Sequence, residues 1–150
     1  MQEEHEVVSI KRQEEQWKEI AEFPGYEISS FGRARSTDRF VKAGRSRRWW
    51  KGQLLSPGKI KGGYLIIAPR KNGKQYSRYI HRLVAEAFLP PPKEGQEVNH
   101  KDGDKTNNHV NNLQWLTHQE NMQHSIDTGL RKRFVFKNHR GSGCTKTWRR

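Results

Sequence analysis

The sequence contains a single cysteine, Cys144, so no disulfide can form within the chain. One thiol also excludes a zinc cage made of cysteines from one chain. Hydrophobic residues are only 31% of the 150 residues, against roughly 45–50% in typical globular domains, so we expect a small core. No apolar run approaches the roughly 20 residues of a membrane helix, and we expect no membrane partner.

Acidic residues are scarce outside the N-terminal region. Residues 1–22 hold seven glutamates against three Lys and Arg residues; because the whole chain carries +13, residues 23–150 carry +17. The stretch 130–150 has eight Lys and Arg residues and no acid. Such a field attracts polyanions, which makes nucleic acid the leading partner. An anionic membrane is second, without a basic amphipathic helix to support it, and a solubilising surface is the remaining interpretation.

The N-terminal third has the pattern of a small β-rich module. Residues 1–15 predict a charged lead-in that is flexible or helical, without the pattern of a signal peptide. Pro24-Gly25 is a turn signal, and the alternating run 26–29 is typical of a half-buried strand. The alternation resumes at 33–36. We therefore predict short strands anchored by aromatic side chains.

Cations and indoles are interleaved in residues 39–51, RFVKAGRSRRWWK. This composition suits contact with phosphates and stacking on bases or sugars. An equally weighted alternative is a surface loop whose tryptophans, Trp49 and Trp50, pack back onto the small core. The basic residues of the stretch are Arg39, Lys42, Arg45, Arg47, Arg48 and Lys51.

Residues 64–88 have the pattern of a strand, a turn, a strand and a helix. The run 64–69 is apolar and β-prone, Asn72-Gly73 is a strong hairpin signal, and 75–80 predicts the return strand. Residues 81–88 place their apolar side chains on one face of a short helix. The prolines that follow end that helix and form a stiff connector.

The asparagine-rich stretch that follows predicts a ββα unit. We expect two strands, over 96–99 and 113–116, on either side of a polar loop, because asparagine favours turns over helices and strands. Thr117 and Glu120 form a T-x-x-E capping box at the start of a helix. Gly129 is the expected C-cap of that helix.

Three polar side chains stand at the key places of this unit. His100 lies where the first strand enters the loop, Asn112 precedes the second strand, and Asn121 lies one turn into the helix, within reach of His100. An imidazole facing a metal ion suits phosphodiester hydrolysis, because histidine can take a proton from water while the metal polarises the phosphate. Oxygen ligands favour Mg²⁺ or Mn²⁺ over metals that prefer thiolates.

At these residues the sequence resembles the HNH family, specifically phage-type HNH homing endonucleases. The signature lies in three segments: VNHKDG with His100, NNLQW with Asn112, and LTHQEN with Asn121. HRLVAEAF also looks like this family, and WKEIAEFPGYEISSFGRARS is similar to the modular unit that precedes such nuclease domains. The resemblance covers about residues 17–129.

The resemblance implies a role for each matching residue. His100 would be the general base, and Asn112 would hold the loop and orient that histidine. Asn121 and Asn99 would be metal ligands, although some relatives have an aspartate where this chain has the neutral Asn99. Two further histidines are candidates for contact with phosphate: His81 and His124. The candidate DNA-binding residues are Arg33, Arg35, Arg45, Arg47, Arg48, Trp49, Lys51, Arg78, Arg82, Arg131, Lys132 and Arg133.

We therefore predict an α+β protein that binds and cuts duplex DNA. After the lead-in come a β-rich nuclease-associated modular domain (16–60), an HNH or ββα-metal nuclease domain (61–130) and a basic DNA-binding tail (131–150). The expected reaction is metal-dependent hydrolysis that leaves 5′-phosphate and 3′-hydroxyl ends. A monomer should nick one strand, whereas cutting both strands would need a dimer or two events. We expect no small-molecule cofactor, and a location in the cytoplasm, that of the host cell if a phage encodes the protein.

Two other functions stay open at this point. The neutral Asn99 favours a DNA-binding protein or regulator in which catalysis is weakened or lost. The basic and aromatic segments also suit stacking on single strands, which would indicate an RNA-binding or RNA-cutting protein.

Overall fold

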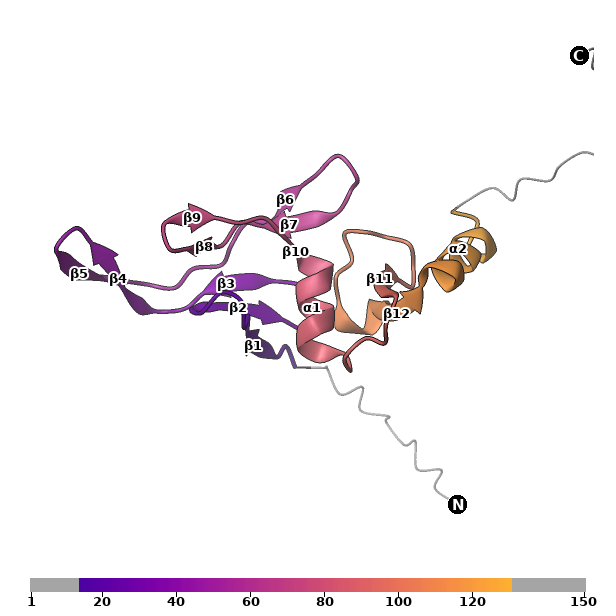
Figure 1. Cartoon of the computed structure of the whole chain (residues 1–150), viewed down its shortest axis with the longest axis horizontal. Helices are drawn as coiled ribbons and strands as arrows, with labels where there is room; N and C mark the ends of the chain where they lie inside the picture. Colours follow the sequence, from indigo (N-terminus) through magenta and orange to yellow (C-terminus); the bar gives the residue numbers. More distant parts are fainter. Residues whose placement is uncertain (1–13, 131–150) are drawn as a thin grey trace, which may run out of the picture.

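The computed structural model describes residues 14–130, which form short strands around one central helix (Figure 1). This mixture of elements confirms the predicted α+β class. No helix in the described part of the chain is long and apolar enough to cross a membrane. The helices are α1 (Ile80–Phe88), α2 (His118–Asp127) and a short 3-10 helix, η1 (Val110–Asn112). The strands are β1 (Trp17–Glu19), β2 (Tyr26–Ser29), β3 (Ala34–Ser36), β4 (Arg39–Ala43), β5 (Ser46–Trp50), β6 (Gly58–Lys59), β7 (Leu65–Ile67), β8 (Arg70–Lys71), β9 (Lys74–Gln75), β10 (Arg78–Tyr79), β11 (Gln96–His100) and β12 (Leu113–Thr117).

The N-terminal sheet is an antiparallel meander in the order β1-β2-β3. The turn predicted at Pro24-Gly25 leads into β2, and Gly25 has a φ of +80°, a conformation that glycine adopts without steric cost. Along β2, Tyr26 and Ile28 are buried, and Ile28 pairs with the buried Ala34 on β3. One face of the sheet therefore contributes to the core.

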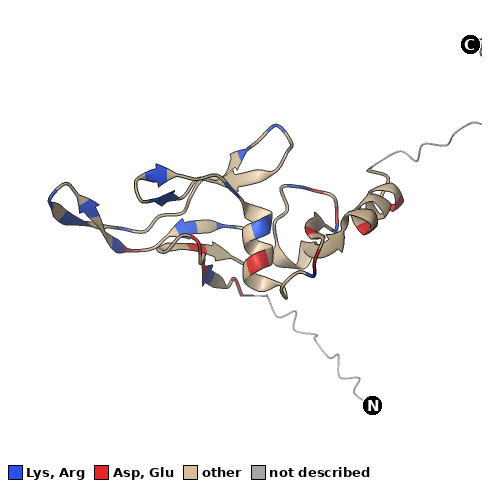
Figure 2. Ribbon diagram, viewed as in Figure 1, with Lys and Arg blue, Asp and Glu red and all other residues tan. Residues whose placement is uncertain are grey.

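Two basic hairpins, β4–β5 and β8–β9, project toward the same end of the molecule (Figures 1 and 2). The β8–β9 hairpin turns at Asn72 and Gly73, whose φ values of 52° and 76° confirm the predicted turn. The predicted return strand over 75–80 is divided in two, since β9 pairs with β8 and β10 pairs with β7. Between them, the backbone N–H of Tyr76 donates to the carbonyl oxygen of Pro69 (2.9 Å).

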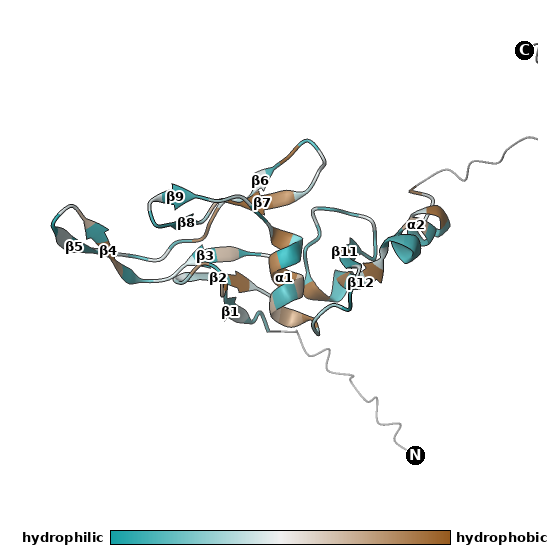
Figure 3. Cartoon of the chain, in the orientation of Figure 1, coloured by the Kyte–Doolittle hydropathy of each residue, from teal (hydrophilic) through white to brown (hydrophobic). Residues whose placement is uncertain are grey.

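One hydrophobic core joins the N-terminal sheet to the remainder of the described chain. Helix α1 contacts β2, β7 and β12, and apolar residues gather on α1 and the strands around it (Figure 3). Ile28, Val84 and Leu113 belong to the same buried cluster. The modular unit and the nuclease unit therefore share their interior, and the division into 16–60 and 61–130 stays a prediction.

The β11–β12 hairpin and α2 form the ββα unit. Its register places His100 opposite Leu113. The hydroxyl of Thr117 accepts the backbone N–H of Glu120 (3.3 Å), and the Glu120 carboxylate accepts the backbone N–H of Thr117 (2.7 Å), which confirms the capping box. Gly129, with a φ of +72°, follows the C-cap residue instead of occupying that position.

Candidate functional site

His100 lies at the inner end of β11, and it is only 4% exposed. Nδ2 of Asn108 donates to the carbonyl oxygen of Thr106 (3.2 Å), so the amide oxygen of Asn108 is the atom that faces the imidazole. This oxygen lies 3.1 Å from Nε2 of His100. Because a carbonyl oxygen can only accept, Nε2 carries a proton, and in the neutral ring the lone pair is therefore on Nδ1. The ring is thus held in the tautomer in which Nδ1 can act as a base.

The N-terminal module supports Asn108. Gly32 has a φ of +79°, and a Cβ added there would lie 2.7 Å from Cβ of Asn108. Two residues further along the loop, the backbone N–H of Val110 donates to the carbonyl oxygen of Ser30 (2.8 Å). The turn that contains Gly32 therefore fits closely against the loop whose amide orients His100.

A second buried histidine packs against His100. The ring of His81, in the first turn of α1, lies 5.1 Å from the His100 ring and 4.9 Å from the Tyr64 ring, measured between centroids. His81 is 5% exposed, and its Nδ1 has no hydrogen-bond partner in the described structure. Burial, together with the charges of His100 and Arg82, lowers the pKa of His81 to about 4. We expected a phosphate contact for His81, but the structure places this residue in the interior and its packing keeps it neutral.

Asn112 closes the loop between β11 and β12. Its Nδ2 donates to Oδ1 of Asp102 and to the carbonyl oxygen of Asn107, both at 2.8 Å, and its Oδ1 accepts the backbone N–H of Asp102 (3.1 Å). Desolvation raises the pKa of Asp102, but hydrogen bonds from Asn107 and Asn112 outweigh it and leave the pKa below its usual value. Asn112 does not bond to the His100 side chain; that hydrogen bond comes from Asn108, which the sequence alone did not single out.

Asn99 and Asn121 bridge β11 and α2. Nδ2 of Asn99 lies 3.3 Å from Nδ1 of His124, and Nδ2 of Asn121 donates to Oε1 of Glu97 (2.7 Å). Each amide is thus anchored through its nitrogen. Both Oδ1 atoms remain without a hydrogen-bond partner among the described residues, and they are the atoms that could bind a cation. The sequence pattern did not indicate that Glu97 belongs to this site.

Strand β11 presents His100 and the side chains beside α2 on opposite faces. Side chains alternate along a strand, so Glu97 and Asn99 face α2, whereas His100 faces the interior with His81. Within the described part of the chain, no hydrogen bond links His100 to Asn121. A cation that lies close both to His100 and to the amide oxygens of Asn99 and Asn121 would therefore have to be at the end of the strand.

The amide and carboxylate oxygens of this region are the type of ligand that a hard divalent cation prefers. No group of three or more His, Cys, Asp and Glu side chains among residues 14–130 is placed to hold a metal ion. The amide oxygens of Asn99 and Asn121 are nevertheless ligands that Mg²⁺ and Mn²⁺ accept, and Glu97 adds a carboxylate beside them. Such a site is incomplete without further oxygens, which phosphate groups of a substrate can supply.

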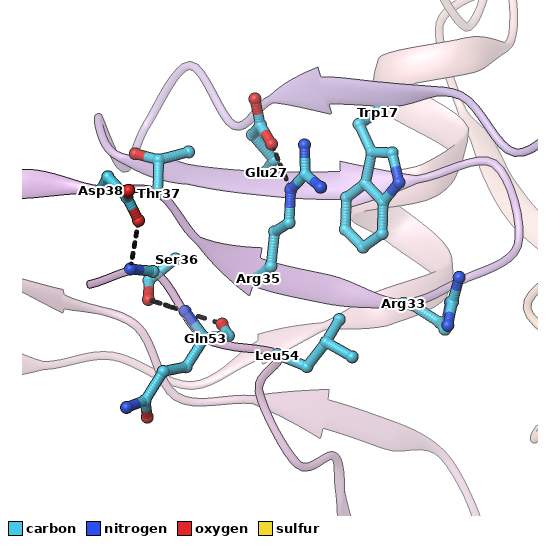
Figure 4. A pocket seen from close by; sticks show the side chains of 10 residues that line it. Trp17, Glu27, Arg33, Arg35, Ser36, Thr37, Asp38, Gln53 and Leu54 are labelled. Carbon is cyan, nitrogen blue, oxygen red and sulfur yellow. Dashed lines mark hydrogen bonds and ion pairs between the residues drawn. The ribbon is translucent and has the colours of Figure 1, made fainter.

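Three of the predicted DNA-binding arginines form ion pairs within the chain. Arg35 lies between the carboxylate of Glu27, 2.6 Å away, and the ring of Trp17, whose centroid is 4.2 Å from the guanidinium carbon (Figure 4). The other two pairs join arginines to glutamates distant in the sequence: Arg33 with Glu15 and Arg78 with Glu22. Their charges are therefore partly neutralised in the free protein.

The remaining candidates divide into three groups. Arg45, Arg47, Arg48, Trp49 and Lys51 lie on or directly after the β4–β5 hairpin, and all are exposed. The exposed fractions of 55% for Trp49 and 36% for its neighbour exclude the alternative in which both indoles pack into the core. Arg82 is exposed on α1. The last three, Arg131, Lys132 and Arg133, lie outside the described residues.

Comparison with known proteins gives the class of this site. Residues 78–123 match the model of the HNH endonuclease family, and residues 15–68 match the NUMOD4 motif. An uncharacterized HNH endonuclease of Acanthamoeba polyphaga mimivirus is 37% identical over 82% of this chain and 33% of its own length. The DNA endonuclease I-HmuI of Bacillus phage SP01 is 36% identical over 76% of this chain and 59% of its own length. H-N-H endonuclease F-TflII of Escherichia phage T5 is 31% identical over 88% of this chain and 62% of its own length.

A solved structure agrees with these matches. It describes DNA binding and cleavage by the HNH homing endonuclease I-HmuI, and it aligns with a TM-score of 0.62 at 34% identity, over 76% of this chain and 59% of that one. Residues 78–123 therefore form an HNH endonuclease domain, and a NUMOD4 motif over residues 15–68 lies ahead of it. The chain spans less than two thirds of the length of each of these relatives.

Proposed function

We propose that this chain is a divalent-metal-dependent endonuclease that nicks duplex DNA, with His100 as its general base. Its relatives support this proposal, since one is named a DNA endonuclease and its structure describes DNA binding and cleavage. The observation that carries it is the buried hydrogen bond between His100 and Asn108, because this bond leaves Nδ1 of the imidazole ready to accept a proton.

The proposed reaction is hydrolysis of one phosphodiester bond. Nδ1 of His100 takes a proton from a water molecule, whose oxygen forms a bond to phosphorus while the bond from phosphorus to the 3′ oxygen breaks. The leaving oxygen takes a proton from solvent, which gives 5′-phosphate and 3′-hydroxyl ends. Mg²⁺ or Mn²⁺, held by the amide oxygens of Asn99 and Asn121, would supply Lewis acidity and neutralise charge on the leaving oxygen.

The neighbours of these residues have supporting roles in the proposal. His124 and Glu97 anchor the nitrogens of the two ligand amides, and His124 keeps its proposed contact with phosphate. Asn112 holds the loop that contains Asn108. One ββα unit has one such base, so we propose a monomer that cuts one strand. We also propose that it works without a small-molecule cofactor and resides in the cytoplasm, that of the host cell if a phage encodes the protein.

A plasmid-nicking assay tests the proposal directly. Purified protein should convert supercoiled plasmid to the open circular form in Mg²⁺ or Mn²⁺, and not in EDTA. His100→Ala should lower the rate by about 10²–10⁴-fold, the usual contribution of a general base, with DNA binding retained. Gln123→Ala is the control, because that side chain is exposed on α2 and its hydrogen bond goes to Asp127 of the same helix. Equal nicking by the His100 and Gln123 variants would refute the role of His100.

A DNA-binding protein without catalysis is the second candidate, and the neutral Asn99 favours it. In that case the wild-type protein would bind duplex DNA but leave plasmid intact at any concentration of Mn²⁺. An RNA-directed nuclease is separated by competition at fixed salt. Duplex DNA, and not RNA of equal length, should displace a bound labelled duplex if the proposal is correct.

A further inference from the structure

Lys105 reaches from the loop between β11 and β12 to the turn between β6 and β7. Its ammonium group donates to the carbonyl oxygen of Gly62 (2.9 Å) and lies over the ring of Tyr64, 4.6 Å from the centroid. Lys105 and Gly62 are 43 residues apart in the sequence. A carbonyl oxygen and the face of an aromatic ring both attract an ammonium group. Lys105 therefore fastens the loop to a distant part of the chain.

The ring that Lys105 contacts is also a neighbour of the two buried histidines. The Tyr64 ring lies 4.9 Å from the His81 ring and 6.1 Å from the His100 ring, measured between centroids. It lies 5.9 Å from the ring of Tyr79. Aromatic rings at these separations pack against one another. A contact that Lys105 makes at the surface is thus passed through one ring to the imidazole of His100.

The turn that receives Lys105 is held by its own hydrogen bonds. The backbone N–H of Ile60 donates to the carbonyl oxygen of Tyr64 (3.1 Å), and the backbone N–H of Gly63 donates to the carbonyl oxygen of Ile60 (2.9 Å). A Cβ added at Gly63 would lie 3.6 Å from Cδ of Lys105, so the lysine stem passes close to this backbone. The turn is therefore a firm support for the lysine.

On its own loop, Lys105 lies next to the residues that hold Asn108. The carbonyl oxygen that accepts Nδ2 of Asn108 belongs to Thr106, the residue after Lys105. The backbone N–H of Thr106 is in turn bonded to the carboxylate of Asp104 (2.9 Å). Movement of Lys105 away from the turn would shift the carbonyl that orients Asn108. The amide oxygen that faces His100 would shift with it.

We propose that Lys105 is a positioning residue for His100, which acts through the Tyr64 ring and through the loop that holds Asn108. The inference rests on the proposed function, in which His100 is the general base. A displacement of about 1 Å in a reacting group can slow a reaction by about 100-fold. Lys105 therefore contributes to the rate of cutting and not to the affinity for DNA, although a lysine could also contact phosphate.

The test compares two substitutions of Lys105 with one of Lys18. Lys105→Met keeps the length of the side chain and removes the ammonium group, whereas Lys105→Arg keeps a cation that can donate to the carbonyl and stack on the ring. Lys18→Met is the matched control. Nζ of Lys18 also donates to a carbonyl oxygen, that of Ala87 (2.8 Å), and lies 4.9 Å from the centroid of the Phe88 ring.

We expect Lys105→Met to slow single-turnover nicking at saturating duplex by about tenfold, with an unchanged dissociation constant for the duplex. Lys105→Arg should recover most of the rate, and Lys18→Met should cut at the wild-type rate. Urea unfolding identifies the temperature at which all four proteins are folded. A wild-type rate in Lys105→Met would overturn the proposal. So would a loss confined to affinity, with a salt slope reduced by about 0.9, because that change marks a single phosphate contact.

A second measurement separates this inference from the proposed function. The nitrogen chemical shifts of imidazoles, observed by NMR at pH 8, report which ring nitrogen carries the proton. The shifts of His100 should be those of the Nε2-protonated tautomer in wild-type protein and in Lys105→Arg, and should move toward the other tautomer in Lys105→Met. Unchanged shifts in Lys105→Met would refute the positioning role, whether or not plasmid is cut. Changed shifts without nicking by wild-type protein would refute the proposed function alone.

Discussion

Asn108 and His100 form a buried hydrogen bond in which the amide oxygen lies 3.1 Å from Nε2 of the imidazole. Both residues are less than 5% exposed, so water cannot easily replace either partner. Since the amide nitrogen of Asn108 is already bonded to Thr106, the amide cannot flip without losing that bond as well. A neutral side chain thus decides which nitrogen of His100 holds the proton.

Asn108→Ala should therefore reduce nicking more than it reduces DNA binding. Loss of the acceptor leaves a buried N–H unpaired, at a cost of about 1–3 kcal/mol in the free energy of unfolding. A base that is no longer held in place should slow the reaction by at least about tenfold. Single-turnover nicking at saturating DNA measures the rate, and urea unfolding measures stability. A wild-type rate in a folded variant would contradict the role assigned to Asn108.

Gly32→Ala should damage the same site from the N-terminal module. The new Cβ would meet Asn108, and a residue other than glycine at positive φ costs about 1–2 kcal/mol. Gly95→Ala is the matched control, because Gly95 also has a positive φ, of +76°, but nothing lies within 4 Å of the added Cβ. We expect both variants to lose stability and only Gly32→Ala to lose nicking activity beyond that loss. Equal activity of the two variants would contradict the coupling.

Asn112 and Asp102 should behave as an energetically coupled pair. Asn112→Ala removes three hydrogen bonds and should lower the free energy of unfolding by about 1–3 kcal/mol. In a double-mutant cycle with Asp102→Ala, the combined loss should be smaller than the sum of the two single losses, because both variants break the bond between Nδ2 of Asn112 and Oδ1 of Asp102. Urea unfolding of the four proteins gives the coupling energy. Strict additivity would show that the loop is held by other contacts.

His81 should make the protein less stable in mild acid. Its pKa is near 4 in the folded chain and about 6.5 when unfolded, so protons bind preferentially to the unfolded state between these values. The stability that His81 contributes is complete above pH 6.5 and is lost as the pH falls toward 4, by about 3 kcal/mol in total. Urea unfolding at pH 7, 5 and 4 should show a shallower decline in His81→Phe than in the wild-type protein.

Asn99→Asp should strengthen binding of divalent cations. A carboxylate adds a negative charge to a pair of neutral amide ligands, and we expect the dissociation constant for Mn²⁺ to fall by about tenfold or more. Asn72→Asp adds the same charge at a hairpin tip where φ is 52°, far from α2, and should leave Mn²⁺ affinity unchanged. Isothermal titration with Mn²⁺, in the absence of DNA, measures both. Equal affinities would show that residue 99 is not a ligand.

Local chemistry made several elements predictable from the sequence. The capping box of Thr117 and Glu120 depends on two residues three positions apart, and the hairpin at Asn72-Gly73 depends on two adjacent residues. The order of the ββα unit followed from the same kind of signal. Such features form through contacts between neighbours in the chain, so they appear in the pattern of residues.

Features that depend on distant contacts could not be predicted in the same way. Arg78 is 56 residues from Glu22 in the sequence. The basic residues around Arg78 therefore indicated a free DNA-binding cation, whereas the fold forms an ion pair. Asn108 stands among several asparagines of one loop, and only the fold shows which of them reaches His100. The burial of His81 likewise depends on the packing of α1 against Tyr64.

The shared core has a consequence for where a cut would fall. Because Ile28 of the N-terminal sheet and Val84 of α1 are both fully buried in one cluster, that sheet cannot swing relative to the imidazole without bringing apolar surface into water. Under the proposed function, DNA bound by the N-terminal sheet would therefore be cut at a constant number of base pairs from the segment that the sheet contacts.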